Sequence, residues 1–158
     1  MGAGQTTRAN RSERDTGPHT TSRGKVRYLP AIARLLMGII FVVMGLNGFL
    51  NFVPQPSTPI PAKALAFLGA LYGTGYMIGA ASGTEVAVGV LLIANRWVPL
   101  ALALIAPIIV NIMLLHLFLA PALIAPAIVV FLLEIYLAWA YRAAFRPMLA
   151  MRTAPDPD

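Results

Sequence analysis

The sequence predicts an all-α integral membrane protein, a bundle of four antiparallel transmembrane helices with one short interfacial or re-entrant helix. The first reason is composition, because 58% of the 158 residues are hydrophobic and 11% are charged, against about 45–50% and about 25% in soluble domains. The second reason is that residues 31–141 hold only five charges, which are Arg34, Lys63, Glu85, Arg96 and Glu134. Such a stretch cannot cover a soluble core with polar surface, which excludes a soluble enzyme or DNA-binding module as the main interpretation.

The two ends of the chain are predicted to be polar tails. Residues 1–30 are rich in Gly, Ser, Thr and Arg and lack an apolar cluster that could offset the cost of ordering them. We therefore expect a disordered basic cytoplasmic tail there, and a second cytoplasmic tail at residues 148–158. The net charge of +6 does not indicate nucleic acid as a partner, because the basic residues flank hydrophobic segments, as topogenic signals do.

Hydropathy defines a transmembrane domain over residues 31–147. The first span is expected at 31–52, and the Pro-rich segment 54–61 stops it, since proline removes a backbone donor and fixes φ. Residues 62–73 would form a helix only about 18 Å long, too short to cross a bilayer, which predicts an interfacial or re-entrant helix. The other spans are predicted at 76–94, 97–119 and 123–143.

Charge asymmetry predicts the orientation. If the N-terminus is cytoplasmic, eight basic residues fall on that side and only Lys63 falls on the other. The eight are Arg23, Lys25, Arg27, Arg34, Arg96, Arg142, Arg146 and Arg152. We therefore expect a multi-pass protein with both termini in the cytoplasm. The Ala-, Arg- and Pro-rich composition favours a bacterial cytoplasmic (inner) membrane.

Three glycines at the start of the second span predict a helix-packing face. Gly75, Gly79 and Gly83 recur every four residues, which places small residues on one side and allows another helix to approach closely. The alternative is the general tolerance of glycine in transmembrane helices, and we favour packing.

Five polar residues within the predicted spans are candidates for ligand binding, because each is costly in hydrocarbon. They are Asn47, Glu85, Asn111, His116 and Glu134. We expect them to line or border one polar pocket in the outer half of the bundle, capped by segment 54–61 and by Tyr72 or Tyr76. Asn111 and His116 are separated by about 140° around a helix, so both can face one centre only if the helix unwinds locally. The alternative is that these side chains only hydrogen-bond across helices and hold the bundle together.

Residue types exclude several cofactors. The absence of cysteine excludes disulfide exchange, thiolate metal sites and iron–sulfur clusters within this chain. A haem held by two histidines is excluded because His116 is the only histidine in the membrane region. We therefore predict no metal site and no intrinsic cofactor. Binding of a hydrophobic molecule, proton exchange through Glu85, His116 or Glu134, and a structural role all remain open.

Several sequence features resemble one family. The first span carries Gly38, Gly45 and the run Asn-Gly-Phe-Leu at 47–50, and the second carries Glu-Val-Ala-Val-Gly-Val-Leu-Leu at 85–92, followed by Asn-Arg at 95–96. Together with the four-helix layout, they resemble the DoxX/DoxD-like integral membrane proteins over residues 31–147. The resemblance implies quinone-linked sulfur oxidation or membership of a membrane oxidoreductase complex. It also implies a recurrent carboxylate in the second helix, which Glu85 matches.

Two classes of function follow. The first is a quinone-associated or lipophilic small-molecule-binding subunit of a membrane oxidoreductase system, with Glu85 and His116 as hydrogen-bond or proton partners for a carbonyl ring. Its partners would be the lipid bilayer, a quinone and a membrane or soluble oxidoreductase. The second class is a non-catalytic membrane scaffold or assembly factor. The sequence leaves open whether the chain catalyses a reaction and whether it forms a homo-oligomer.

Overall fold

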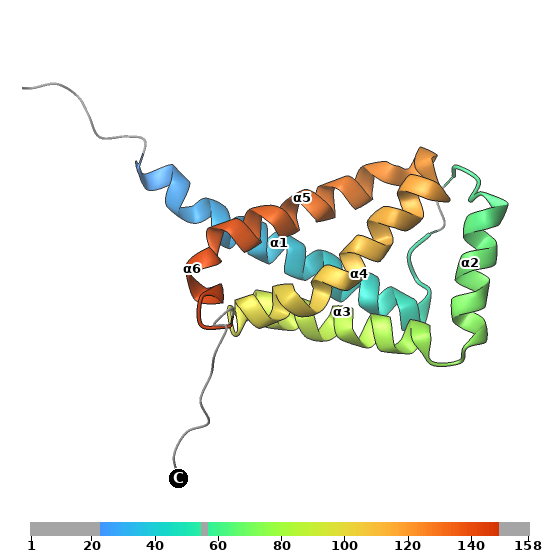
Figure 1. Cartoon of the computed structure of the whole chain (residues 1–158), viewed down its shortest axis with the longest axis horizontal. Coiled ribbons are helices and arrows are strands. Elements are labelled where there is room, and N and C mark those ends of the chain that lie inside the picture. Colours follow the sequence, from blue (N-terminus) through green and yellow to red (C-terminus); the bar gives the residue numbers. More distant parts are fainter. Residues whose placement is uncertain (1–22, 55–56, 149–158) are drawn as a thin grey trace, which may run out of the picture.

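Four long helices run back and forth along one axis in the computed structural model, which describes residues 23–54 and 57–148 (Figure 1). The elements are α1 (Arg23–Leu50), α2 (Ala62–Gly73), α3 (Met77–Ile93), α4 (Val98–Phe118), the 3-10 turn η1 (Pro121–Leu123), α5 (Ile124–Ala140) and α6 (Arg142–Phe145). Helices α1 and α4 run in one direction and α3 and α5 in the other. The predicted all-α antiparallel membrane bundle is confirmed. We call its two ends the α2 end and the Arg96 end, after the helix and the connection that lie there.

Helix length and hydropathy support the membrane assignment. Three segments are each long and apolar enough to cross a membrane, namely Tyr28–Leu50, α4, and Pro121–Ala140. Helix α3 qualifies only together with α2, from which it is separated by a short break and a bend of 91°. Helix α3 has 17 residues and is therefore about 25 Å long. Because α2 lies crosswise at the end of the bundle, α3 alone forms the second of the four spans, and α2 matches the predicted short helix (Figure 1).

The start of the first span differs from the prediction. Helix α1 begins at Arg23 rather than at residue 31, so the boundary of the predicted tail at residue 30 is wrong. Adding a turn to an existing helix is much easier than nucleating a new one, which explains why segment 23–30, with its three basic residues, continues α1. The rest of that tail, residues 1–22, lies outside the described residues.

The end of the fourth span also differs, since α5 stops at Ala140 rather than at residue 143. Carbonyl groups in the last turn of a helix lack partners within the helix. The Arg142 guanidinium donates a hydrogen bond of 3.0 Å to one of them, the carbonyl oxygen of Trp139. This bond favours a helix end at Ala140. Of the tail predicted at 148–158, only Met148 belongs to the described residues.

Helices α1 and α3 approach each other at backbone contact through small residues. A Cβ placed on Gly38 would lie 2.9 Å from the Gly89 carbonyl oxygen, and one on Gly45 would lie 2.7 Å from the Ser82 carbonyl oxygen. The two positions on each helix are seven residues apart, so antiparallel pairing brings both small pairs into register. Lipid supplies no hydrophobic driving force between helices. Van der Waals contact between closely packed backbones stabilises the α1–α3 pair instead.

The predicted glycine packing face is wrong in the described part of the chain. A Cβ added to Gly75, Gly79 or Gly83 would meet nothing within 4 Å. Gly75 has φ of +76°, a conformation that favours glycine, and it forms the turn between α2 and α3. The face of α3 that packs on α1 carries Ser82 and Gly89 instead. A four-residue repeat marks a face of a helix, but it does not say which neighbour lies there.

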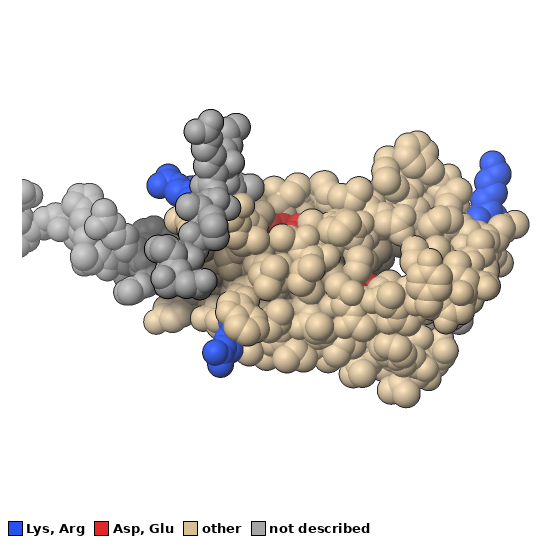
Figure 2. Space-filling view, turned by 60° about the horizontal axis from the view of Figure 1, so that its bottom comes forward, with Lys and Arg blue, Asp and Glu red and all other residues tan. Residues whose placement is uncertain are grey.

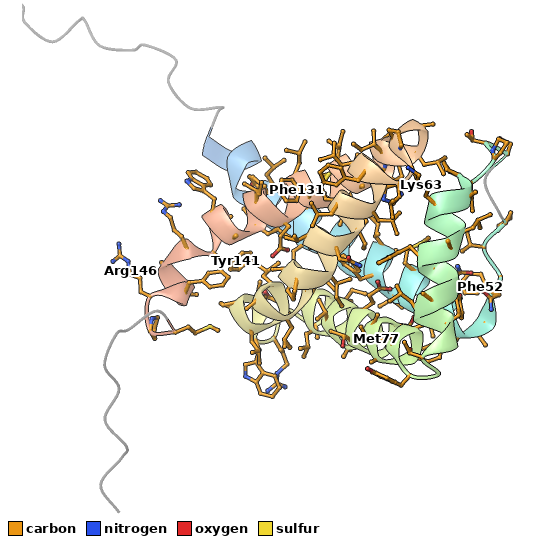
Figure 3. The ribbon with its side chains drawn as sticks, turned by 45° about the vertical axis from the view of Figure 1, so that its right-hand side comes forward. Phe52, Lys63, Met77, Phe131, Tyr141 and Arg146 are labelled. Atoms are coloured by element: carbon orange, nitrogen blue, oxygen red, sulfur yellow. The ribbon has the colours of Figure 1, made fainter. Side chains whose placement is uncertain are left out.

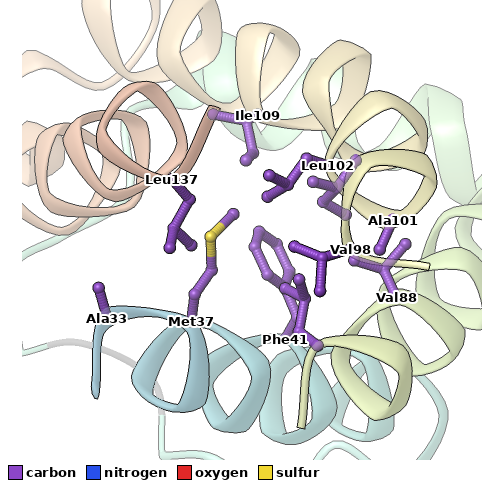
Figure 4. Close-up of a cluster of buried hydrophobic side chains, with 11 residues drawn as sticks. Ala33, Met37, Phe41, Val88, Val98, Ala101, Leu102, Ile109 and Leu137 are labelled. Carbon is purple, nitrogen blue, oxygen red and sulfur yellow. The ribbon is translucent and has the colours of Figure 1, made fainter. Parts of the chain in front are cut away.

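Apolar side chains from all four spans meet in one core (Figure 4). Met37 and Phe41 come from α1, Val88 from α3, Ile105 from α4 and Leu137 from α5, and each is at most 2% exposed. Most other large side chains on the spans point outward and are exposed, as expected where lipid is the solvent. The core therefore fixes how the helices are rotated, and with that which polar side chains face inward.

Arg34 caps the C-terminal end of α3. Its Nη1 donates hydrogen bonds to the carbonyl oxygens of Leu92 and Ile93, with 3.3 Å for the second. Both carbonyls belong to the last turn of α3, where the helix dipole also favours a cation. A charged residue inside the first span is therefore explained by the antiparallel neighbour that it caps.

Basic side chains mark the two ends of the bundle, whereas the acidic ones show only as small red patches set into the tan surface between them (Figure 2). Lys63 extends from α2 at one end and Arg146 from the region of α6 at the other (Figure 3). At the Arg96 end, the Arg142 guanidinium lies 4.6 Å from the centre of the Trp139 ring, and that of Arg96 lies 5.9 Å from the Trp97 ring. Arg–Trp pairs of this kind are typical of a membrane–water interface.

Candidate functional site

A cavity of about 670 Å³ lies among α1, α3, α4 and α5, in the half of the bundle toward the α2 end. This volume is in the range of about 300–1,000 Å³ that is usual for small-molecule sites. Its lining is apolar except for one carboxyl and one imidazole. The lining residues are Ile40, Phe41, Met44, Glu85, Ile112, His116, Pro126, Ala127, Val129 and Val130.

Glu85 reaches the cavity from the middle of α3. It lies one turn before Val88 and Gly89, which are both buried against the other helices, so it is on the side of α3 that faces the bundle. The residue is half-buried, and none of the side-chain hydrogen bonds among the described residues involves its carboxyl. Both oxygens are therefore free to bond a ligand in the cavity.

His116 reaches the same cavity from α4. Its Nδ1 lies 2.8 Å from the carbonyl oxygen of Ile112, one turn earlier. A carbonyl can only accept, so Nδ1 carries the hydrogen and donates it. In the neutral ring, Nε2 is then an acceptor, and it is not used by this bond. The cavity thus offers a carboxyl group and an imidazole nitrogen to the polar part of a ligand.

Asn111 lies elsewhere, and the prediction of one common pocket is wrong for it. It lines two neighbouring grooves of about 230 and 650 Å³, which it shares with Phe67 of α2. Helix α4 is continuous from Val98 to Phe118, so Asn111 and His116 keep their wide angular separation. Local unwinding, which a shared pocket would need, does not occur.

Asn47 has a structural role at the end of α1. Its Oδ1 accepts a hydrogen bond of 2.7 Å from the backbone N–H of Val53. Between them, Asn51 adopts a left-handed conformation with φ of +49°, which Asn tolerates better than most residues and which ends the helix. Asn47 therefore fixes the exit of the chain from α1 and does not line the Glu85–His116 cavity.

Glu134 is also separate from this cavity. It lies on α5 in the half of the bundle toward the Arg96 end, and it is half-buried. Its buried Oε2 has no hydrogen-bond partner among the described residues. The structure therefore brings Glu85 and His116 together and leaves Asn47, Asn111 and Glu134 at three other places.

The predicted cap of the pocket is not found. Tyr72 and Tyr76 are 54% and 68% exposed, and neither lines the cavity. The described residues of segment 54–61 do not line it either. Helix α2, which the bend of 91° places across the end of the bundle, contributes Phe67 to the grooves at Asn111 instead.

No protein-family model, no curated protein and no solved structure matches this chain. The resemblance to DoxX/DoxD-like proteins therefore stays a prediction. The chemistry of the site rests on its geometry alone.

The apolar walls of the cavity were not predicted, although part of their pattern is visible in the sequence. Ile112 lies one turn before His116, and Pro126 lies one turn before Val130, so each pair shares a helix face. Placing these faces opposite each other requires the rotation of α4 and α5. Helices α4 and α5 are apolar on almost every side, so their sequences do not define how each helix is rotated about its axis.

Proposed function

We propose that this chain is an integral membrane protein that binds a lipophilic small molecule, whose polar group bonds to Glu85 and His116. One observation carries this proposal, namely that two polar side chains from different helices share an otherwise apolar cavity within the spans. Polar groups at this depth cost free energy unless they are paired. A ligand that hydrogen-bonds to both would offset that cost.

A quinone is the ligand class that suits these groups best. Its ring carbonyls accept hydrogen bonds from a protonated carboxyl or imidazolium, and the hydroxyls of the reduced ring can donate to His116 Nε2 or to a carboxylate. The sequence has no cysteine and a single histidine in the membrane region, so electrons would come from a membrane or soluble oxidoreductase partner. The DoxX-like sequence features favour the same role.

Mass spectrometry of the purified protein tests this function. We expect a lipophilic compound with a carbonyl or hydroxyl ring to co-purify with the wild-type chain and to be lost in Glu85→Gln and His116→Ala. Asn111→Ala is the matched control, because it removes a polar side chain at a similar depth but outside the cavity. Retention of the compound in all three variants would place its binding site elsewhere.

A membrane scaffold or assembly factor is the alternative function. In that case, protein mass spectrometry of the same samples would find a partner that is retained in both Glu85→Gln and His116→Ala, with no lipophilic compound above the level of bulk lipid. This outcome would end the ligand-binding proposal, because the cavity would then have no role.

We further propose that the protein lies in a bacterial inner membrane with both termini in the cytoplasm. The excess of basic residues at the Arg96 end and its two Arg–Trp pairs support this orientation. A reporter fused after Asp158 and another inserted at Ser57 should be labelled from opposite sides of the membrane. Labelling of both from one side would contradict the topology.

A further inference from the structure

The Glu85–His116 cavity extends from the bundle core to the lipid-facing surface. Phe41 and Ala127 form its floor and are only 2% and 3% exposed. Met44 and Val129 form its rim and are 43% and 51% exposed. The rim residues belong to α1 and α5, so the cavity is open along the seam between these two helices.

The seam is open because α1 and α5 diverge. Near the Arg96 end they are in contact, where Leu137 packs beside Met37 in the core (Figure 4). From there the two helices separate toward the α2 end (Figure 1). At this level α5 contributes only small and medium-sized side chains to the cavity wall, which are Pro126, Ala127, Val129 and Val130.

The exposed rim of the cavity lies within the length of the spans. All lining residues belong to the helices of the spans, and none comes from a connection at either end of the bundle. Met44 lies six residues before the end of α1, which corresponds to a depth of about 9 Å. Val129 lies five residues after the start of α5, which corresponds to about 8 Å. The two rim residues therefore lie at one level below the α2 end.

We propose that the ligand reaches the cavity sideways from the bilayer, between α1 and α5, and is an amphiphile with a long apolar tail. This inference rests on the proposed function and adds the class of ligand and its route. The polar head bonds to Glu85 and His116 inside the cavity, while the apolar tail passes between Met44 and Val129 and stays in the lipid.

Photolabelling in lipid nanodiscs with a lipid-soluble aryl diazirine tests this route without knowledge of the ligand. We expect the carbene to label Phe41 and Ala127, although both are buried, because hydrocarbon reaches them through the seam. Val88 and Ile105 are the matched controls, since they are equally buried but lie in the closed core. They should stay unlabelled.

Closing the seam provides the second arm of the experiment. In Met44→Trp/Val129→Trp, labelling of Ala127 should fall to the level of Ile105, whereas the lipid-facing Leu132 should be labelled as in the wild type. Val129→Trp alone should give a partial loss, which covers the case in which the double variant does not fold. The inference is overturned if Phe41 and Ala127 are labelled no more than Ile105 in the wild type, or if both tryptophans leave their labelling unchanged. Failure of the proposed function would appear separately, as the absence of any co-purifying compound.

Discussion

Gly45→Leu should abolish the folded bundle. A Cβ at this position would lie 2.7 Å from the Ser82 carbonyl oxygen and 2.9 Å from the Val86 nitrogen, both backbone atoms that cannot move without displacing α3. Extra methylene groups in a well-packed core cost about 1–3 kcal/mol and sometimes more. We expect Gly45→Ala to lower the melting temperature in detergent clearly. The Leu variant should show no cooperative unfolding, as measured by scanning fluorimetry.

Gly83→Leu is the control for this prediction. It places the same side chain on the same pair of helices, but at a position where an added Cβ meets nothing within 4 Å. Its melting temperature should stay close to that of the wild type. Equal destabilisation by the two Leu variants would show that close contact of the α1 and α3 backbones does not hold the bundle together.

Arg34→Leu should be the next most damaging substitution. It removes the hydrogen bonds from Nη1 to the carbonyl oxygens of Leu92 and Ile93, which belong to the last turn of α3. Hydrogen bonds from a charged group contribute about 1.5–3 kcal/mol. The Leu92 carbonyl would keep only the bond of 3.2 Å from the Asn95 backbone N–H. We expect a loss of unfolding free energy of about this size, measured by denaturation in mixed micelles.

Arg96→Leu separates this effect from a general loss of positive charge. Arg96 is exposed, and its guanidinium lies over the Trp97 ring, 5.9 Å from the ring centre. A cation–π pair at an exposed site contributes about 0.5–1 kcal/mol, so this variant should be the milder of the two. Equal losses in both variants would contradict the capping role of Arg34.

The fold could be predicted from the sequence because the bilayer permits few alternatives. Backbone groups in hydrocarbon must bond within their own helix, so long apolar stretches become spans whatever their detailed sequence. The spans at 76–94 and 97–119 match α3 (Met77–Ile93) and α4 (Val98–Phe118) closely for this reason. The end of the fourth span was predicted wrongly because a single side chain, Arg142, caps α5 at Ala140.

The site could be predicted only in part. The cost of polar groups in hydrocarbon singled out Glu85 and His116, which line one cavity, but it applied equally to Asn47, Asn111 and Glu134. Which of these side chains meet depends on the rotation of each helix about its axis. Small residues such as Gly45 and Ser82 set that rotation for α1 and α3. Their spacing of seven residues is visible in the sequence, whereas the pairing of one helix with the other is not.

The most direct test is a crystal structure of the protein extracted from its native membrane with its lipids retained. We predict electron density for an amphiphile whose polar head lies between Glu85 and His116 and whose tail leaves the bundle past Met44 and Val129. An empty cavity that has closed by contact of α1 with α5, or a ligand found only in the grooves at Asn111, would contradict this function.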